Sequence, residues 1–249
     1  MQVALTLFPG VSADECEAFT LAFSKLPDCE LVGVGARVGD VAGPGGRQVV
    51  DAAFAEVSAP DVVLVPGGLG VDRTAHDEQL LEWLRLVEPS CQWMAASSTG
   101  TVVVAAAGLL ADRPAATHWL AGRMLAEYGS EASAQRIVEV GRVLTCHGRI
   151  SAMDVALLMI LRLYNRETAA RVKREIEAGD DRVIEPRRSG VGRLLGRARA
   201  VVGRSRSPRS GGQPRPHNEQ LDTSEWIEME LTEAPWVASG RTSRRKRSG

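Results

Sequence analysis

The sequence has no excess of charge of either sign. Lys and Arg together number 30 and Asp and Glu 31, giving a formal net charge of −1 over 249 residues. This balance excludes a globally basic nucleic-acid binder. The chain also has no run of about 18 uncharged apolar residues, and its first residues show neither the basic nor the long apolar segment of a secretion signal. We therefore expect a cytoplasmic protein.

Closely spaced cysteines are also missing. The four cysteines lie far apart, and no two have the spacing that brings two thiolates onto one metal ion; they are Cys16, Cys29, Cys91 and Cys146. We therefore predict reduced thiols, no metal site and no bound cofactor.

The near-zero net charge is the sum of two parts with opposite charge. Residues 1–181 hold 15 basic and 24 acidic residues, whereas residues 182–249 hold 15 basic and 7 acidic residues. Between Pro186 and Asn218 there are nine arginines and no acid among many Gly, Ser and Pro residues, a composition that buries too little apolar surface to fold. We predict one folded domain over 1–181 and a disordered tail over 182–249.

The predicted tail lacks two consecutive amphipathic helices, so we expect no sequence-specific DNA binding by a helix-turn-helix module. Its arginines are suited to contact an acidic partner or surface.

Short apolar runs alternate with helical patterns along the first part. Strands are predicted at 3–8, 30–34, 61–65 and 92–96, extended segments at 136–140 and 142–146, and helices at 14–26, 78–87 and about 151–178. The continuously apolar run 61–65 is typical of a strand that is buried on both faces of a parallel sheet. The pattern predicts an α/β fold with a mostly parallel central sheet, helices on both faces, and ligands at the carboxyl ends of the strands.

One stretch has the spacing of a catalytic turn. The predicted strand at 92–96 leads through Ser98, Thr99 and Gly100 into a helix of small residues. A sharp strand-to-helix turn of this kind is a nucleophile elbow, which exposes one side chain at a helix N-terminus, here Ser98. Backbone N–H groups of this turn and of the turn at 66–68 are placed to stabilise an anion.

Five motifs, in order, resemble the ThiJ/PfpI superfamily, which is related to the class I glutamine amidotransferase-like, flavodoxin-like fold. They are Phe8-Pro9-Gly10-Val11, the run 61–68, the run 98–110, Ala115-Ala116-Thr117-His118-Trp119 and Ser151-Ala152-Met153-Asp154. The resemblance covers about residues 2–180 and is nearest to isonitrile hydratases and the sensor domains of related transcription regulators. It implies a three-layer sandwich, a homodimer and a small-molecule ligand.

The resemblance also implies the site residues. In the family the elbow residue is a cysteine, which an acidic residue early in the chain and a histidine assist; these positions hold Ser98, Glu15 and His118 here. A serine hydroxyl ionises far less readily than a thiol and needs an adjacent general base. The family's activity therefore does not transfer directly to this chain.

Three interpretations of Ser98 stay open. It is a nucleophile with His118 as its base, a ligand-binding hydroxyl in a pocket that has lost its chemistry, or a small residue tolerated in a tight turn. In the first interpretation, Gly67, Gly68 and Thr99 form the ligand-binding backbone, with the N–H groups of Gly68 and Thr99 as an oxyanion hole. A hydrogen bond between Ser98 and His118 would favour this interpretation.

The other candidate residues have structural alternatives. Glu15 lies three residues after Ser12 and could complete a capping box, and Asp14 could replace it if the helix were shifted by one residue. His118 could simply begin a surface helix. Cys146 could be a relocated nucleophile, although an ordinary buried cysteine is favoured.

The predicted function is small-molecule binding, or weak hydratase or hydrolase chemistry of the isonitrile hydratase kind. On an isonitrile, Glu15 would protonate or polarise the substrate, and Ser98 or an ordered water would attack it. The alternative is a non-catalytic sensor or interaction protein whose tail contacts a partner.

Overall fold

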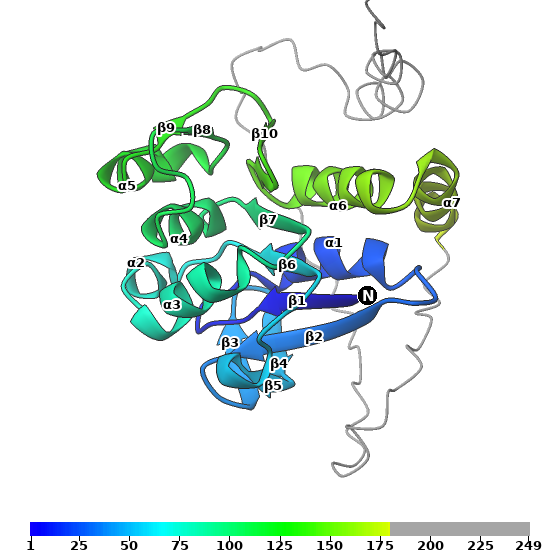
Figure 1. The fold of residues 1–249 in the computed structure, drawn as a ribbon, viewed down its shortest axis with the longest axis horizontal. Helices are drawn as coiled ribbons and strands as arrows, with labels where there is room; N and C mark the ends of the chain where they lie inside the picture. Colours follow the sequence, from blue (N-terminus) through cyan, green and yellow to red (C-terminus); the bar gives the residue numbers. More distant parts are fainter. Residues whose placement is uncertain (180–249) are drawn as a thin grey trace, which may run out of the picture. The chain divides into compact units, whose positions relative to one another are not determined.

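The structure is a computed structural model that describes residues 1–179 (Figure 1). The predicted boundary at residue 181 and the predicted tail over 182–249 lie outside the described residues.

A seven-stranded sheet forms the middle layer, with strand order β10-β11-β7-β6-β1-β2-β5. All neighbouring strands are parallel except β10 and β11. The strands are β1 (Gln2–Thr6), β2 (Glu30–Gly35), β5 (Ala52–Ala53), β6 (Val62–Val65), β7 (Trp93–Ser97), β10 (Ile137–Val140) and β11 (Val143–Cys146). All four residues of β6 are buried, as expected for an apolar strand with β1 and β7 on either side and helices over both faces.

Helices cover the two faces of this sheet, as Figure 1 shows. On one face α1 (Ala13–Phe23), α6 (Arg149–Leu163) and α7 (Arg166–Glu177) pack against one another. On the other, α4 (Gly100–Ala106) packs against α2 (Val71–Thr74), α3 (Glu78–Val87) and α5 (Gly122–Glu127). The predicted three-layer α/β fold with a mostly parallel sheet is confirmed.

Several short elements were not predicted. They include β5, α2 and α5, the hairpin β3 (Gly39–Gly43) and β4 (Gly46–Val50), the pair β8 (Pro114–Ala115) and β9 (Glu131–Ala132), and the 3-10 turns η1 (Phe54–Glu56) and η2 (Trp119–Ala121). The tip of the hairpin braces the loop that precedes α1, since Gly10 N–H donates to Ala42 O at 2.8 Å and Ala13 N–H to Pro44 O at 2.9 Å.

Two expectations about the C-terminal half have different outcomes. The extended segments around Gly141 form an antiparallel hairpin, with Gly141 at φ 61° in its turn. The single helix predicted from about 151 to 178 is wrong, because α6 ends before Tyr164 and a second helix, α7, begins at Arg166. Asn165 caps α7 by accepting the N–H of Thr168 at 2.9 Å, and an Asn in this position favours a helix start over a continuing helix.

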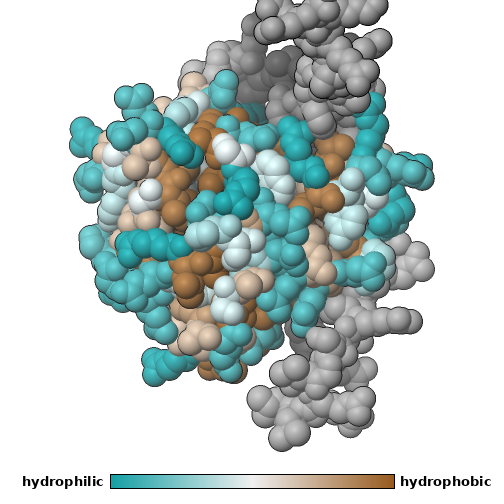
Figure 2. Space-filling view, viewed as in Figure 1, coloured by the Kyte–Doolittle hydropathy of each residue, from teal (hydrophilic) through white to brown (hydrophobic). Residues whose placement is uncertain are grey.

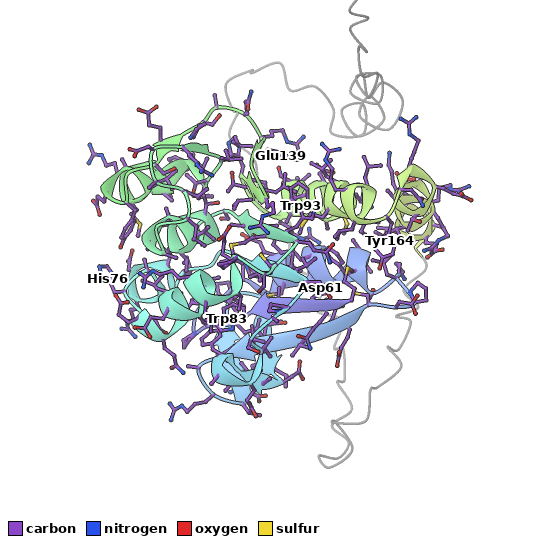
Figure 3. All side chains as sticks on the ribbon, in the orientation of Figure 1. Asp61, His76, Trp83, Trp93, Glu139 and Tyr164 are labelled. Carbon is purple, nitrogen blue, oxygen red and sulfur yellow. The ribbon has the colours of Figure 1, made fainter. Side chains whose placement is uncertain are left out.

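Trp83 anchors the layer of α3 to the loop after η1. Trp83 is labelled in Figure 3. Its indole N–H donates to Val57 O at 2.6 Å, and its ring lies 5.1 Å from that of Phe54. On the surface, apolar residues gather in patches between polar ones on the face seen in Figure 2. Within residues 1–179, the helices are too short or too polar to cross a membrane.

Candidate active site at the end of the central strands

The turn between β7 and α4 is strained and held on both sides. Ser98 has φ 55°, in the left-handed region, which costs a non-glycine residue about 1–2 kcal/mol. Its N–H donates to Cys146 O at 2.8 Å, and its carbonyl accepts the hydroxyl of Thr117 at 2.8 Å. Hydrogen bonds from two other segments therefore hold Ser98 in this conformation, at the carboxyl end of a central strand.

Glu15 reaches this turn from the first turn of α1. The residue is buried, and its Oε2 accepts the N–H of Gly67 at 2.8 Å and the hydroxyl of Ser97 at 2.5 Å. Ser12 occupies the N-cap position of α1, but its side chain makes no capping hydrogen bond, so the capping box is not formed. Asp14 is exposed to solvent and does not take the place of Glu15.

Gly67 lies in close contact with Glu15 and with both residues of the turn, Ser98 and Thr99. A Cβ atom at Gly67 would lie 2.7 Å from Ser98 Cβ, 2.9 Å from Thr99 N and 3.0 Å from Glu15 Oε2. Only glycine leaves room for so close an approach. Glu15, Ser98 and Thr99 thus come together at Gly67, although the first is 83 residues away from the second in the sequence.

Two side-chain oxygens of these residues have no hydrogen-bond partner in the described part of the chain. Within residues 1–179, no hydrogen bond reaches Glu15 Oε1 or Ser98 Oγ, and neither atom is completely shielded from solvent. Both oxygens are therefore open to water or to a polar ligand.

The backbone donors differ from those expected. Gly68 N–H donates to Thr99 Oγ1 at 2.9 Å, and the same hydroxyl donates to Gly68 O at 2.9 Å. Gly67 N–H is bound to Glu15, as described above. Across the described part of the chain, Thr99 N–H has no acceptor. Thr99 therefore supplies an available donor at the turn, while Gly68 positions Thr99.

His118 follows Thr117, whose hydroxyl binds the turn, but its own side chain is not bonded to Ser98 in residues 1–179. Its Nδ1 accepts the N–H of Leu120 at 3.3 Å, at the start of η2, and its ring lies 5.7 Å from that of Trp119. His118 is half-buried, and the preceding Thr117 is the residue that binds Ser98 O. The hydrogen bond that would favour a nucleophilic Ser98 with His118 as base is thus missing here.

All four cysteines are buried, including Cys16 and Cys146, which lie next to Glu15 and Ser98. Burial raises the pKa of Cys16 to about 12, with a further contribution from the neighbouring Glu15 carboxylate. Burial also raises the pKa of Cys146, whose side chain is fully enclosed. A thiol that stays protonated is a poor nucleophile, so Cys146 is an ordinary buried cysteine. Residues 1–179 contain no group of three or more His, Cys, Asp or Glu side chains placed to hold a metal ion.

Sequence reasoning missed two hydroxyls that support the site. Ser97 binds Glu15, and Thr117 binds the backbone of Ser98. The available signal for Ser97 was a polar residue at the end of an otherwise apolar strand, next to the serine at the turn. For Thr117, no signal indicated which backbone atom it would meet.

An open cleft of about 600 Å³ lies elsewhere at this end of the sheet. Its walls come from the end of β1 and the segment around α2, and they are Phe8, Pro9, Gly10, Leu69, Gly70, Asp72, Arg73, Thr74 and Asp77. None of the groups around Gly67 lines it.

Comparison with known proteins identifies the family. A sequence model of the DJ-1/PfpI family matches residues 1–161. The chain belongs to the DJ-1/PfpI family. The predicted relationship to the ThiJ/PfpI superfamily is therefore confirmed.

Relatives of this DJ-1/PfpI protein include an isonitrile hydratase from Pseudomonas putida. It is 30% identical over 178 residues, which cover 71% of this chain and 78% of the relative. A ThiJ/PfpI family protein from Pseudomonas syringae has a similar structure, with a TM-score of 0.67, 23% identity, and coverage of 73% of this chain and 75% of that one. DJ-1beta from Drosophila melanogaster gives a TM-score of 0.63 at 21% identity, covering 71% and 97%. These two structures support the fold alone.

Proposed function

We propose that this DJ-1/PfpI domain binds a small neutral molecule between Glu15 and Ser98 and adds water to its terminal carbon, as in the hydration of an isonitrile to a formamide. The observation that carries the proposal is the pair of unpaired oxygens, Glu15 Oε1 and Ser98 Oγ, in two residues that lie in close contact with Gly67. The substrate class is supported by the 30% identical relative, an isonitrile hydratase.

The proposed step needs one carboxylate and one water. Glu15 Oε1 takes a proton from the water while the water oxygen bonds to the terminal carbon of R–N≡C. The carboxyl group then gives that proton to the same carbon, which leaves R–N=CH–OH, and this rearranges to R–NH–CHO. One water is consumed, no electrons are exchanged, and Glu15 returns to its starting state.

Attack by water is favoured over attack by Ser98. A serine hydroxyl needs an adjacent base to become a nucleophile, and no base is hydrogen-bonded to Ser98 Oγ within residues 1–179. In this proposal the Ser98 hydroxyl and Thr99 N–H hold the water and the developing charge.

The test is turnover of a small alkyl isonitrile, followed by formamide formation in NMR spectra. We expect wild-type turnover, a loss of about 100-fold or more in Glu15→Gln, and a smaller loss in Ser98→Ala. Asp14→Asn is the matched control, because it removes the neighbouring exposed carboxylate from the same helical turn. Equal turnover by Glu15→Gln and the wild type would refute the role of Glu15, and a covalent adduct in the intact mass would refute attack by water.

A second candidate is binding without turnover, as in a sensor. It is favoured by the replacement of the family's cysteine with Ser98 and by the absence of a bonded base for Ser98 within the described residues. In that case, the wild type would bind the isonitrile without converting it, and Ser98→Cys would convert it.

A further inference from the structure

Ser97, the residue before the turn, makes an unusually direct contact with Glu15. It is the last residue of β7, has no solvent exposure, and donates its hydroxyl to Glu15 Oε2 at 2.5 Å. This distance is typical of a hydroxyl that donates to a charged carboxylate. The two adjacent serines thus have different surroundings: Ser97 is bound to Glu15, and Ser98 Oγ is open.

The contact determines which oxygen of Glu15 stays without a hydrogen bond in the described residues. Oε2 accepts two donors, Gly67 N–H and the Ser97 hydroxyl, so it acts as an acceptor only. The terminal torsion of a glutamate is broad, and one donor alone would leave the carboxyl group free to rotate. Two donors on one oxygen restrict that rotation and leave Oε1 as the oxygen that can exchange a proton.

We infer that Ser97 is a positioning residue that holds Glu15 Oε2, so that Oε1 stays free to exchange a proton. The inference deepens the proposed function and rests on it, since it concerns the carboxyl group that moves the proton. It assigns different tasks to the two serines: Ser97 orients the acid, and Ser98 contacts the ligand.

A substrate-free reporter can test this inference separately from turnover. In Ser98→Cys, the rate at which iodoacetamide alkylates Cys at position 98 reports the surroundings of that thiol, including the carboxyl of Glu15. The native cysteines should stay silent at pH 8, because burial raises the pKa of Cys16 and Cys29 to about 12 and that of Cys91 to about 11, and Cys146 is fully enclosed. The intact mass of the wild type after treatment with iodoacetamide shows whether any native cysteine has been alkylated.

The experiment is a double-mutant cycle in the Ser98→Cys background. Ser97→Ala is made once with Glu15 present and once together with Glu15→Ala. If the Glu15→Ala proteins do not fold, Glu15→Leu is used in place of Glu15→Ala. If Ser97 acts through Glu15, Ser97→Ala should change the alkylation rate by about threefold or more with Glu15 present, and very little without it. Thr6→Ala is the control, since it removes another buried hydroxyl at a strand end, one that donates to Leu64 O.

The inference would be overturned if Ser97→Ala changed the alkylation rate by the same factor with and without Glu15, or changed it in neither case. The effect of a merely structural Ser97 would not depend on Glu15. No isonitrile is used, so failure of this cycle is distinct from failure of the proposed reaction. If the cycle shows coupling and no isonitrile is converted, the positioning role stands, and the proposed function fails.

Discussion

Gly67→Ala should damage both stability and the site, because the added methyl group has no space. Its Cβ would lie 2.7 Å from Ser98 Cβ, 2.9 Å from Thr99 N and 3.0 Å from Glu15 Oε2. Two of these neighbours belong to a turn that hydrogen bonds hold on both sides, so they cannot move aside easily. Overpacking of this kind costs about 1–3 kcal/mol.

The cost can be measured as a change in unfolding. For a domain of this size, each kcal/mol lowers the midpoint of thermal unfolding by roughly 2–4 °C, so Gly67→Ala should lower it by about 2–12 °C. Urea unfolding followed by circular dichroism gives the free energy directly. The same methyl group should also disturb the bond from Gly67 N–H to Glu15 Oε2, so isonitrile turnover should fall further than the loss of folded protein explains.

Gly122→Ala is the matched control. Gly122 begins α5, and a Cβ there would meet only Ala132 Cβ, at an ordinary 3.5 Å. Alanine favours a helix over glycine, so this variant should be as stable as the wild type or more stable by up to about 1 kcal/mol. Equal stabilities of Gly67→Ala and Gly122→Ala would refute the close approach described for Gly67.

Three further predictions concern strain, a buried hydrogen bond and pH. Ser98→Gly should raise the urea midpoint, because glycine tolerates a φ of 55°, but it also removes the hydroxyl at the site. Asp112→Gly, at φ 58°, should likewise stabilise the folded protein without affecting ligand binding. Trp83→Phe should cost about 1–2 kcal/mol in urea unfolding, since it leaves Val57 O without its donor; unchanged stability would contradict this. The pKa of Cys16 is raised from 9.0 to about 12, so the folded state holds its proton while the unfolded state loses it. Stability should therefore fall as pH rises from about 9 toward 12, and by less in Cys16→Ala; an identical fall in both proteins would contradict this assignment.

Much of the fold was predictable because its signals are local. The apolar run at 61–65 is as buried as its composition indicates, and the helix predicted at 78–87 has the observed bounds. The long C-terminal helix was wrong because apolar periodicity continued across Asn165, whereas a capping side chain decided where the second helix begins. The hairpin β3–β4 was missed because its strands are short and largely exposed, with glycine at the tip.

The candidate site was predictable only in outline. The order of motifs indicated Glu15, Ser98, Thr99 and His118, but it could not show which atoms meet. The bond from Ser97 to Glu15 joins residues 82 positions apart. It forms because the end of β7 and the start of α1 lie at the same edge of the sheet. Likewise, the occupied N–H of Gly68 follows from its contact with Thr99, which no local pattern shows.

By itself, the sequence determined the alternation of strands and helices, the family and the strand-to-helix turn at Ser98, because hydrophobic periodicity and turn residues act over a few neighbouring positions. The tertiary structure decided which atoms pair. Glu15 binds Ser97 and Gly67, and His118 binds the backbone N–H of Leu120, while the hydroxyl of Ser98 has no partner in the described residues. Such pairings depend on where distant segments come together in the folded chain, and distances of a few tenths of an ångström decide which hydrogen bonds form.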